Sequence, residues 1–317
     1  MKAIILKENG SPDNLTMAER PDPEIGDDEV MVKVKAISIN PVDASVRQNS
    51  GTLQHILQPA ENEKEYILGW DISGTIAEVG SNVKDFKQGD DVFGMVNFAG
   101  NGKAYAEYVA APANQLALKP ANITHEEAAG ATLAALTAWQ ALVRHAKVKG
   151  GEKVLIHAAA GGVGHYAVQI AKYFGAYVIG TASEANHDFL RELGADECID
   201  YTQEKFEDKV HDADIVIDSV GGDHLLRSVT ALKKGGRLIC LKGEIDENVN
   251  QKAEQKNVLT YRQMVRSNGD DMKHIAQLLE EGQLHSHISK IFRFDQMPDA
   301  HRQIETRKTR GKIVIEV

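Results

Sequence analysis

Residues 1 to about 122 alternate apolar and polar positions with a period of two. The alternation is clearest from Val30 to Ile37, which is typical of a half-buried β-strand. Further strands are predicted within residues 1–6, 71–80, 89–94 and 105–109. We therefore expect the first part of the chain to be β-rich.

A helix is predicted to begin at Thr124. Thr124 followed by Glu127 fits a capping box, in which the hydroxyl and the carboxylate satisfy reciprocal backbone amides. The apolar positions that follow, among them Ala134 and Leu142, extend the expected helix towards Gly150. We expect one long helix over this segment.

Beyond Gly151, predicted strands and helices alternate. Expected strands are residues 153–158, 177–181, 198–201, 215–220 and 237–241, and expected helices are residues 163–174 and 188–193. Because the strands are nearly continuous apolar runs, they predict a parallel sheet covered by helices. The pattern then becomes mixed and ends in a strand over residues 312–317. This order indicates a doubly wound α/β domain, residues 123–259, inserted into a β-rich domain made of residues 1–122 and 260–317.

Composition excludes several classes of partner. The 317 residues include 36 basic and 46 acidic side chains, a formal net charge of −10. Without a basic run, such a chain is not expected to bind nucleic acid or anionic membranes. No apolar stretch approaches the roughly 18 residues of a membrane span, and the N-terminal apolar run is too short for a signal peptide. We expect a cytoplasmic protein that acts on a small molecule.

Cysteine and histidine usage gives no sign of a metal. Cys198 and Cys240 each lie in an apolar, strand-like run, and we expect two buried free thiols. A structural zinc cluster needs about four closely spaced ligands, which two distant cysteines do not supply. The tightest histidine pair, His285 and His287 around Ser286, is expected to be a solvated turn.

The motif with the clearest chemistry is Ala159-Ala160-Gly161-Gly162-Val163-Gly164. Compared with the dinucleotide pattern GxGxxG, Ala159 replaces the first glycine, while Gly161 and Gly164 keep the other two. Such glycines permit a tight turn, close approach to a pyrophosphate and close packing of helix on strand. The pyrophosphate then binds at the helix N-terminus, where free amides favour an anion. With a predicted strand before it and a helix after it, the motif predicts a dinucleotide site.

The end of the second predicted strand selects the cofactor. Enzymes that use NAD usually place an acidic residue about 20 residues after the loop, to bind the ribose 2′-hydroxyl. Here Thr181 and Ser183 supply small hydroxyl side chains that leave room for a 2′-phosphate, and Tyr201 could add a donor. Glu184 stands nearby as an objection, and no basic residue lies beside Ser183. We predict NADP(H) in preference to NAD.

Together, these features resemble the medium-chain dehydrogenase/reductase superfamily, in particular its quinone oxidoreductase and alkenal (enone) reductase branch. The resemblance covers essentially the whole chain and implies a GroES-like substrate domain beside a Rossmann nucleotide domain. The motifs that carry it are Ser38 to Asp43, Leu68 to Asp71, Leu136 to Trp139, Ala158 to Gly164 and Gly311 to Val314.

The resemblance also implies positions for cofactor contacts. Asn40 is expected near the nicotinamide ribose and Thr137 near the nicotinamide amide. The ends of two further strands are expected to line the cofactor groove with Ser219, Val220, Leu241, Lys242 and Gly243. Alternatives remain open, since Asn40 could only shape the turn before Pro41, Thr137 could only be packed, and Lys242 could be a solvated strand end.

Two positions depart from the zinc-using relatives. Where those enzymes have a cysteine ligand this chain has Asn40, and where they have a histidine ligand it has Trp70. Neither residue supplies a thiolate or an imidazole. The resemblance therefore implies a zinc-free member of the superfamily.

Without a Lewis acid, reduction of a simple carbonyl is harder, whereas hydride addition to the β-carbon of an enone delivers charge to an oxygen that hydrogen bonds can stabilise. We expect an NADPH-dependent reductase of quinones or α,β-unsaturated carbonyls. The alternatives are a zinc-free carbonyl or enoyl-thioester reductase, and a non-catalytic NADPH-binding protein. No residue is assigned as catalytic, because Asp43, Tyr66 and Asp71 are more often structural. The resemblance implies a homodimer, and the strand Arg237 to Leu241 is the expected sheet edge.

Overall fold

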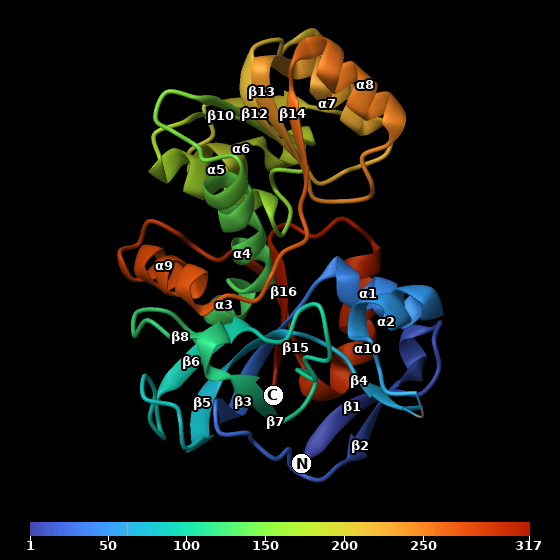
Figure 1. Cartoon of the computed structure of the whole chain (residues 1–317), viewed down its shortest axis with the longest axis vertical. Coiled ribbons are helices and arrows are strands. Elements are labelled where there is room, and N and C mark those ends of the chain that lie inside the picture. The colour runs from blue at the N-terminus through green and yellow to red at the C-terminus, as the bar shows by residue number, and fades with distance from the viewer. Residues whose placement is uncertain (62) are drawn as a thin grey trace. The chain divides into compact units, whose positions relative to one another are not determined.

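The computed structural model describes residues 1–61 and 63–317, which form two compact units. Unit one contains residues 1–136 and 266–317, and unit two contains residues 137–265. Figure 1 traces how the chain leaves unit one and later returns to it. The crossings fall after Leu136 and Val265, while the domain boundaries expected from sequence lie at 122/123 and 259/260. Residues 123–136 group with unit one because the first helix of this stretch packs on its main sheet.

Unit one is built on a seven-stranded sheet in the order β15-β16-β3-β5-β6-β8, with β7 paired to β3. All pairings are antiparallel except that of β15 with β16. The strands are β3 (Glu29–Ile39), β5 (Asp71–Val79), β6 (Asp91–Met95), β7 (Tyr108–Pro112), β8 (Leu116–Leu118), β15 (Ile288–Arg293) and β16 (Lys312–Glu316). A small sheet in the order β2-β1-β4 contains β1 (Lys2–Leu6), β2 (Leu15–Glu19) and β4 (Tyr66–Ile67). The expected β-rich first part is confirmed.

The helical elements of unit one are short. They are η1 (Pro12–Asn14), α1 (Pro41–Gln48), α2 (Ser50–Leu57), η2 (Ala113–Gln115), α3 (His125–Gly130), α9 (Gly269–Glu280), η6 (Phe294–Gln296) and α10 (Met297–Glu305). The strand expected at 105–109 begins only at Tyr108, and before it Ala106 forms one isolated bridge to Ala3. Tyr105 is instead fully buried, and its hydroxyl takes part in a polar network described below.

The single long helix expected after Thr124 is wrong. Its capping box is present, since Thr124 Oγ1 accepts from the Glu127 amide at 3.2 Å and Glu127 Oε2 accepts from the Thr124 amide at 2.8 Å. However, α3 ends at Gly130, and Ala131 leaves the helical region with φ −92° and ψ 32°. A new helix, α4 (Leu133–Trp139), begins with the Leu133 amide donating to an Asp71 carboxylate oxygen, and a π-helical turn, η3 (Gln140–His145), follows. A side chain from a distant strand thus provides a second helix start, which local periodicity does not reveal.

Unit two is a doubly wound α/β fold. Its six strands are all parallel, in the order β11-β10-β9-β12-β13-β14. They are β9 (Lys153–Ile156), β10 (Tyr177–Ala182), β11 (Glu197–Asp200), β12 (Ala213–Asp218), β13 (Leu232–Cys240) and β14 (Leu259–Arg262). The helices are α5 (Gly164–Tyr173), η4 (Glu184–Asn186), α6 (His187–Glu192), η5 (Phe206–Asp208), α7 (His224–Ala231) and α8 (Glu247–Lys256). Figure 1 shows α5 on one side of this sheet and α7 with α8 on the other.

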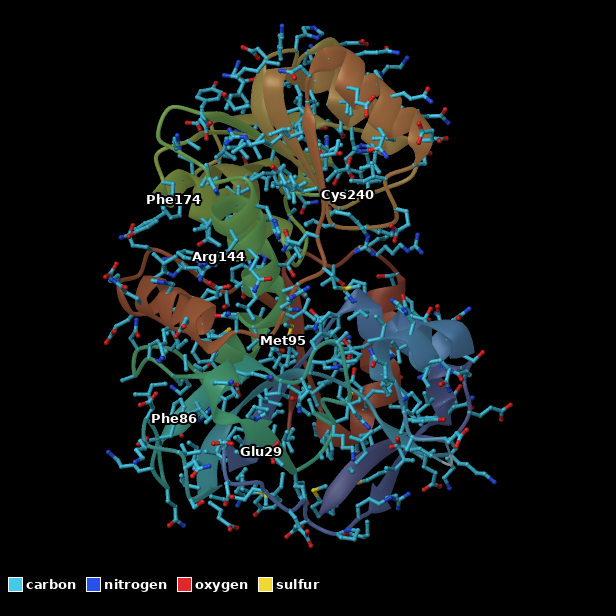
Figure 2. All side chains as sticks on the ribbon, in the orientation of Figure 1. Glu29, Phe86, Met95, Arg144, Phe174 and Cys240 are labelled. Carbon is cyan, nitrogen blue, oxygen red and sulfur yellow. The ribbon has the colours of Figure 1, made fainter. Side chains whose placement is uncertain are left out.

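The edge of this sheet is not where the sequence placed it. The strand Arg237 to Leu241 was expected at the edge, but β13 lies between β12 and β14. The edge strands are β11 and β14, and the short sequence of β14, Leu-Thr-Tyr-Arg, has no apolar run that would predict a strand. Cys240, labelled in Figure 2, is buried at the end of β13, while Cys198 is half-buried, and both are free thiols. Among the described residues, no helix has the length and apolarity needed to cross a bilayer.

Candidate functional site

The glycine loop between β9 and α5 has the geometry of a dinucleotide turn. Ala158 adopts a positive φ of 49°, and the Gly161 amide donates to its carbonyl at 2.9 Å. A Cβ at Gly164 would lie 2.3 Å from the Ala158 oxygen and 2.6 Å from the Ala159 Cα. The start of α5 therefore rests directly on the turn, and only glycine fits at Gly164. This is the close packing of helix on strand that the motif predicted.

Ala159, which replaces the first glycine of the pattern, is accommodated by a neighbouring glycine. A Cβ at Gly180 on β10 would lie 3.0 Å from the Ala159 Cβ and 2.9 Å from Leu190 Cδ1. The missing side chain at Gly180 leaves room for the methyl group of Ala159. The departure from the pattern therefore does not distort the turn.

The loop presents unpaired amides at the start of α5. Among residues 1–61 and 63–317, none accepts a hydrogen bond from the backbone N–H groups of Gly162, Val163 or Gly164. The first amides of a helix carry the positive end of its dipole. These groups can bind an anion such as a pyrophosphate.

Two residues with hydroxyl side chains, Ser183 and Tyr201, directly follow the ends of β10 and β11. The residues before them, Ala182 and Asp200, are paired in the parallel sheet. Ser183 Oγ accepts from the Asn186 side chain at 3.0 Å, while Tyr201 is 62% exposed and available to a ligand. The Glu184 amide donates to the Asp200 carboxylate, whose pKa is lowered mainly by the Thr202 amide and hydroxyl.

Thr181 faces inward. It is 3% exposed, and its hydroxyl lies 3.1 Å from His157 Nδ1 and 3.3 Å from the Ala158 amide. Its side chain is thus occupied by the protein, in contrast to the exposed side chain of Tyr201.

A buried polar cluster under these strand ends was missed at the sequence level. Asp218, at the end of β12, accepts from the Val220 amide at 2.9 Å, from Ser228 at 2.7 Å and from His224 at 2.8 Å. Burial would raise the pKa of Asp218, but these hydrogen bonds and charges hold it well below its usual range. Burial lowers the pKa of the neighbouring His157 to about 3. The members of this cluster come from separate strands and a helix and form no short sequence motif. Their spacing along the chain could therefore not have predicted it.

The residues expected to line the cofactor groove directly follow the carboxyl ends of the neighbouring strands β12 and β13. Ser219 donates to the His157 carbonyl at 3.1 Å, and Val220 is 42% exposed. From the neighbouring strand, the Leu241 amide donates to the Asp218 carbonyl at 2.8 Å. The next residues stay close, because a Cβ at Gly221 would lie 2.4 Å from the Lys242 oxygen.

Two side chains of unit two, Arg262 and Gln263, donate hydrogen bonds to the backbone carbonyls of two further expected cofactor residues. Arg262 Nε donates to the Gly243 carbonyl at 2.8 Å. The Thr137 carbonyl accepts from Gln263 Nε2 at 3.0 Å, and Thr137 is 8% exposed.

In unit one, Asn40 lies in a buried network. Its Oδ1 accepts from Lys312 Nζ at 2.5 Å, and its Nδ2 donates to Asp71 Oδ2 at 2.7 Å. Asn40 is 2% exposed, and its backbone amide donates to Asp43 Oδ2 at 2.8 Å. Burial lowers the pKa of Lys312 and raises that of Asp71, and the attraction between the two charges opposes both shifts. The carboxamide is thereby fixed in orientation by a donor on one side and an acceptor on the other.

A second buried chain leads to Asp43. Arg47 Nε donates to His301 Nδ1 at 3.2 Å, His301 Nε2 lies 3.0 Å from the Tyr105 hydroxyl, and that hydroxyl donates to Asp43 Oδ1 at 2.9 Å. Since arginine only donates, the neutral His301 ring must carry its proton on Nε2. Burial lowers the pKa of His301 to about 3, and burial together with the charge of Asp71 raises the pKa of Asp43 to about 7.

The residues at the zinc-ligand positions do not fit a zinc ion. Lys312 already brings an ammonium to the carboxamide oxygen of Asn40, and this charge would repel a cation. Trp70 is 1% exposed, and its Nε1 donates to the Gly100 carbonyl at 2.8 Å, while its ring meets that of Phe98 edge-on at 5.2 Å. In the described part of the chain, one group has metal-like spacing, since His157, Asp218 and His224 offer ligand atoms within 4.8 Å of one another.

A groove of ≈ 730 Å³ lies in unit one. Its walls include Glu29 and Phe86, which Figure 2 labels, together with Asp270 and Lys273. Both signs of charge face it, and none of the residues expected to bind the cofactor lines it.

Comparison with known proteins agrees with this geometry. The family described as alcohol dehydrogenase GroES-like domain matches residues 26–121, and that described as zinc-binding dehydrogenase matches residues 193–315. The chain is 34% identical to the chloroplastic NADPH-dependent alkenal/one oxidoreductase of Arabidopsis thaliana and 35% identical to the 2-methylene-furan-3-one reductase of Solanum lycopersicum. Each alignment covers 99% of this chain and 79% of the relative.

A solved structure agrees over the full length. The quinone oxidoreductase from Coxiella burnetii superposes with a TM-score of 0.92 at 38% identity, covering 100% of this chain and 99% of that one. The match in both domain families, in sequence and in structure shows that the chain belongs to the medium-chain dehydrogenase/reductase superfamily.

Proposed function

We propose that this chain is an NADPH-dependent oxidoreductase that reduces quinones or α,β-unsaturated carbonyls by hydride transfer. The observation that carries the proposal is the glycine loop, with unpaired amides at Gly162, Val163 and Gly164 above a sheet whose next strand end offers Ser183 and Tyr201. The names of the similar proteins, an alkenal/one oxidoreductase and a quinone oxidoreductase, support the same reaction class.

The cofactor would be held by groups along this edge of unit two. The three amides of the loop would bind the pyrophosphate, and the hydroxyls of Ser183 and Tyr201 would bind the 2′-phosphate. Ser219, Val220, Leu241, Lys242 and Gly243 would line the remaining length of the nucleotide. Asn40 and Thr137 stay candidates for the nicotinamide end. When bound, the nicotinamide supplies the hydride, and the protein's part is to orient it and exclude water.

We propose that the reaction uses no zinc. The carboxamide of Asn40 is bound to Lys312 and Asp71, and the indole of Trp70 has no lone pair to offer. A substrate oxygen must therefore gain its stabilisation from hydrogen-bond donors, which suits the enolate formed from a conjugated carbonyl. Metal analysis of the purified protein should find less than stoichiometric zinc.

NADPH oxidation across a panel of quinones and enones tests the proposed reaction. We expect turnover of at least one class after removal of metal by a chelator, and a higher kcat/KM with NADPH than with NADH. Binding of NADPH without turnover of any panel member would contradict the reductase and favour a non-catalytic NADPH-binding protein. Turnover of saturated ketones or enoyl thioesters alone would favour the alternative reductases.

We also propose a homodimer. The edge strand β14 is open among the described residues, and Leu259 on it is 54% exposed, so two copies could pair along this edge. Sedimentation at micromolar concentration should show a dimer, and a monomer alone would contradict it.

A cytoplasmic location is proposed on the two free thiols, because reducing compartments keep cysteines unpaired. Fractionation of source cells tests the location directly.

A further inference from the structure

Three strand ends and one helix of unit two meet in a cluster of buried side chains. Thr181 comes from β10, His157 follows β9, Asp218 ends β12, and Ser228 and His224 come from α7. His157 and Asp218 are 1% and 0% exposed, and Ser228 is 0% exposed. Because no bulk water reaches these groups, each polar hydrogen must have a partner within the protein.

The direction of each hydrogen bond follows from the available protons. Asp218 accepts from several donors and is ionised, so Ser228, at 2.7 Å, donates its only proton to Asp218. His157 Nε2, at 3.2 Å from the same hydroxyl, must therefore be a donor to it. The His157 ring is neutral, so its Nδ1 is a lone pair that accepts from the Thr181 hydroxyl at 3.1 Å. His224 Nδ1, at 2.8 Å from the carboxylate, donates as well.

We propose that Thr181, His157, Ser228 and Asp218 form a one-way chain of hydrogen bonds that positions the two loops expected to bind NADP(H). At one end, the Thr181 hydroxyl accepts from the amide of Ala158, where the glycine loop turns. This inference rests on the proposed function, because the loops are positioned for the cofactor assigned there.

The other end of the chain holds the loop after β12. Asp218 Oδ1 accepts from the amides of Val220 and Gly221, at 2.9 and 3.0 Å. The same carboxylate thus receives the chain on Oδ2 and fixes the loop on Oδ1. The four residues touch neither cofactor nor substrate in this assignment and are positioning residues.

The positions of these protons argue against two other functions of the cluster, a metal site and a hydrolytic triad. A metal ion would need a lone pair on His157 Nε2, which instead carries a proton, and Ser228 already lies between that nitrogen and Asp218. A hydrolytic triad would need an accessible serine that donates to histidine, whereas Ser228 is buried and donates to the carboxylate.

Long-range proton–nitrogen NMR of the whole protein reads the tautomer of His157 without any cofactor. We expect the proton on Nε2 in the wild type. In Asp218→Asn, the carboxamide keeps an acceptor for the Val220 and Gly221 amides but donates to Ser228, so the serine proton turns to His157. The His157 proton should then move to Nδ1.

Direct titration with NADPH tests the positioning role. Ser228→Ala removes the hydroxyl that joins His157 to Asp218 and so interrupts the chain of hydrogen bonds. We expect the Kd for NADPH to rise by about five-fold, which is the effect of one lost hydrogen bond. The kcat at saturating NADPH should stay within about two-fold of wild type. The matched control is Thr230→Ala on the same helix. The Thr230 hydroxyl donates to the Leu226 carbonyl and accepts from Lys252, so it takes no part in the chain of hydrogen bonds. Its Kd should change by less than about two-fold.

If His157 of the wild type carries its proton on Nδ1, the proposed direction of the hydrogen bonds is wrong, even in a protein that binds NADPH normally. An unchanged Kd in Ser228→Ala, or an equal rise in Thr230→Ala, would overturn the positioning role. Stoichiometric binding of Co²⁺ or Zn²⁺ that is lost in His224→Gln would overturn the assignment in favour of a metal site. Absence of NADPH binding by the wild type would contradict the proposed function itself, while the NMR result would still decide the direction of the chain.

Discussion

The ammonium of Lys312 lies 2.5 Å from the carboxamide oxygen of Asn40, joining the last strand of the chain to the end of β3 across a separation of 272 residues. The other side of the same carboxamide donates to Asp71. Asn40 therefore bridges a buried cation and a buried anion. One amide group thus links the two buried charges through two hydrogen bonds.

Removing the cation should destabilise the fold. In Lys312→Met the Asp71 carboxylate stays buried without its opposite charge, which costs about 3 kcal/mol of unfolding free energy. Urea denaturation followed by circular dichroism measures this loss. The exposed Lys308→Met serves as control and should stay within about 0.5 kcal/mol of wild type. Equal stabilities for the two variants would show that the buried pair contributes nothing.

Asp43 should give an unusual dependence of stability on pH. Its folded pKa is about 7, above the usual value of 3.8, because burial and the charge of Asp71 disfavour the ionised form. The folded state thus binds more protons than the unfolded state between these values, and the stabilising contribution is lost as pH rises from about 4 to about 7.

The comparison of wild type with Asp43→Asn isolates this contribution, since His157 and His301, whose folded pKa values are about 3, shift stability in the opposite direction in both proteins. We expect the unfolding free energy of the wild type minus that of Asp43→Asn to fall steadily as the pH rises from about 4 to about 7. The exposed Asp85→Asn is the matched control, because it makes the same substitution at the protein surface. A difference that rises with pH would mean that Asp43 is stabilised as the anion.

Gly164→Ala should damage the nucleotide loop. The added methyl group would meet the Ala158 oxygen at 2.3 Å, so α5 must move away from the turn and its free amides must shift with it. We expect at least a ten-fold rise in the Kd for NADPH and a loss of about 1–3 kcal/mol in stability, as is usual for overpacking. Gly150→Ala is the control, because its methyl group would meet only the Phe174 oxygen at 3.4 Å. Normal NADPH affinity in Gly164→Ala would contradict the role assigned to the loop.

The parts of the structure that depend on local pattern could be predicted from sequence. The period of two located β3, the capping box at Thr124 located a helix start, and the spacing of glycines located the turn at Gly164. Alternating strands and helices also predicted the doubly wound sheet.

Contacts between distant segments could not be predicted in this way. Asp71 interrupts an otherwise continuous helical pattern by binding the Leu133 amide, and β14 forms the sheet edge through four residues of mixed polarity. The proximity of Asp218 and His157 depends on the register of β12 against β9, which no single segment specifies. Such contacts are set by the packing of whole strands.

We propose that Ser183 and Tyr201 bind the 2′-phosphate, and we expect one added charge at Ser183 to weaken the preference for NADPH. Ser183→Asp places a carboxylate where the 2′-phosphate of NADPH is proposed to bind, and the two negative charges repel each other, while a carboxylate can accept hydrogen bonds from the ribose hydroxyls of NADH. We expect the ratio of kcat/KM for NADPH to that for NADH to fall at least ten-fold, which corresponds to about 1.4 kcal/mol. Steady-state kinetics with one quinone substrate measures the ratio, and Ser183→Ala, which removes the hydroxyl without adding charge, should lower it less. If Ser183→Asp keeps the wild-type ratio, the 2′-phosphate does not bind at the ends of β10 and β11.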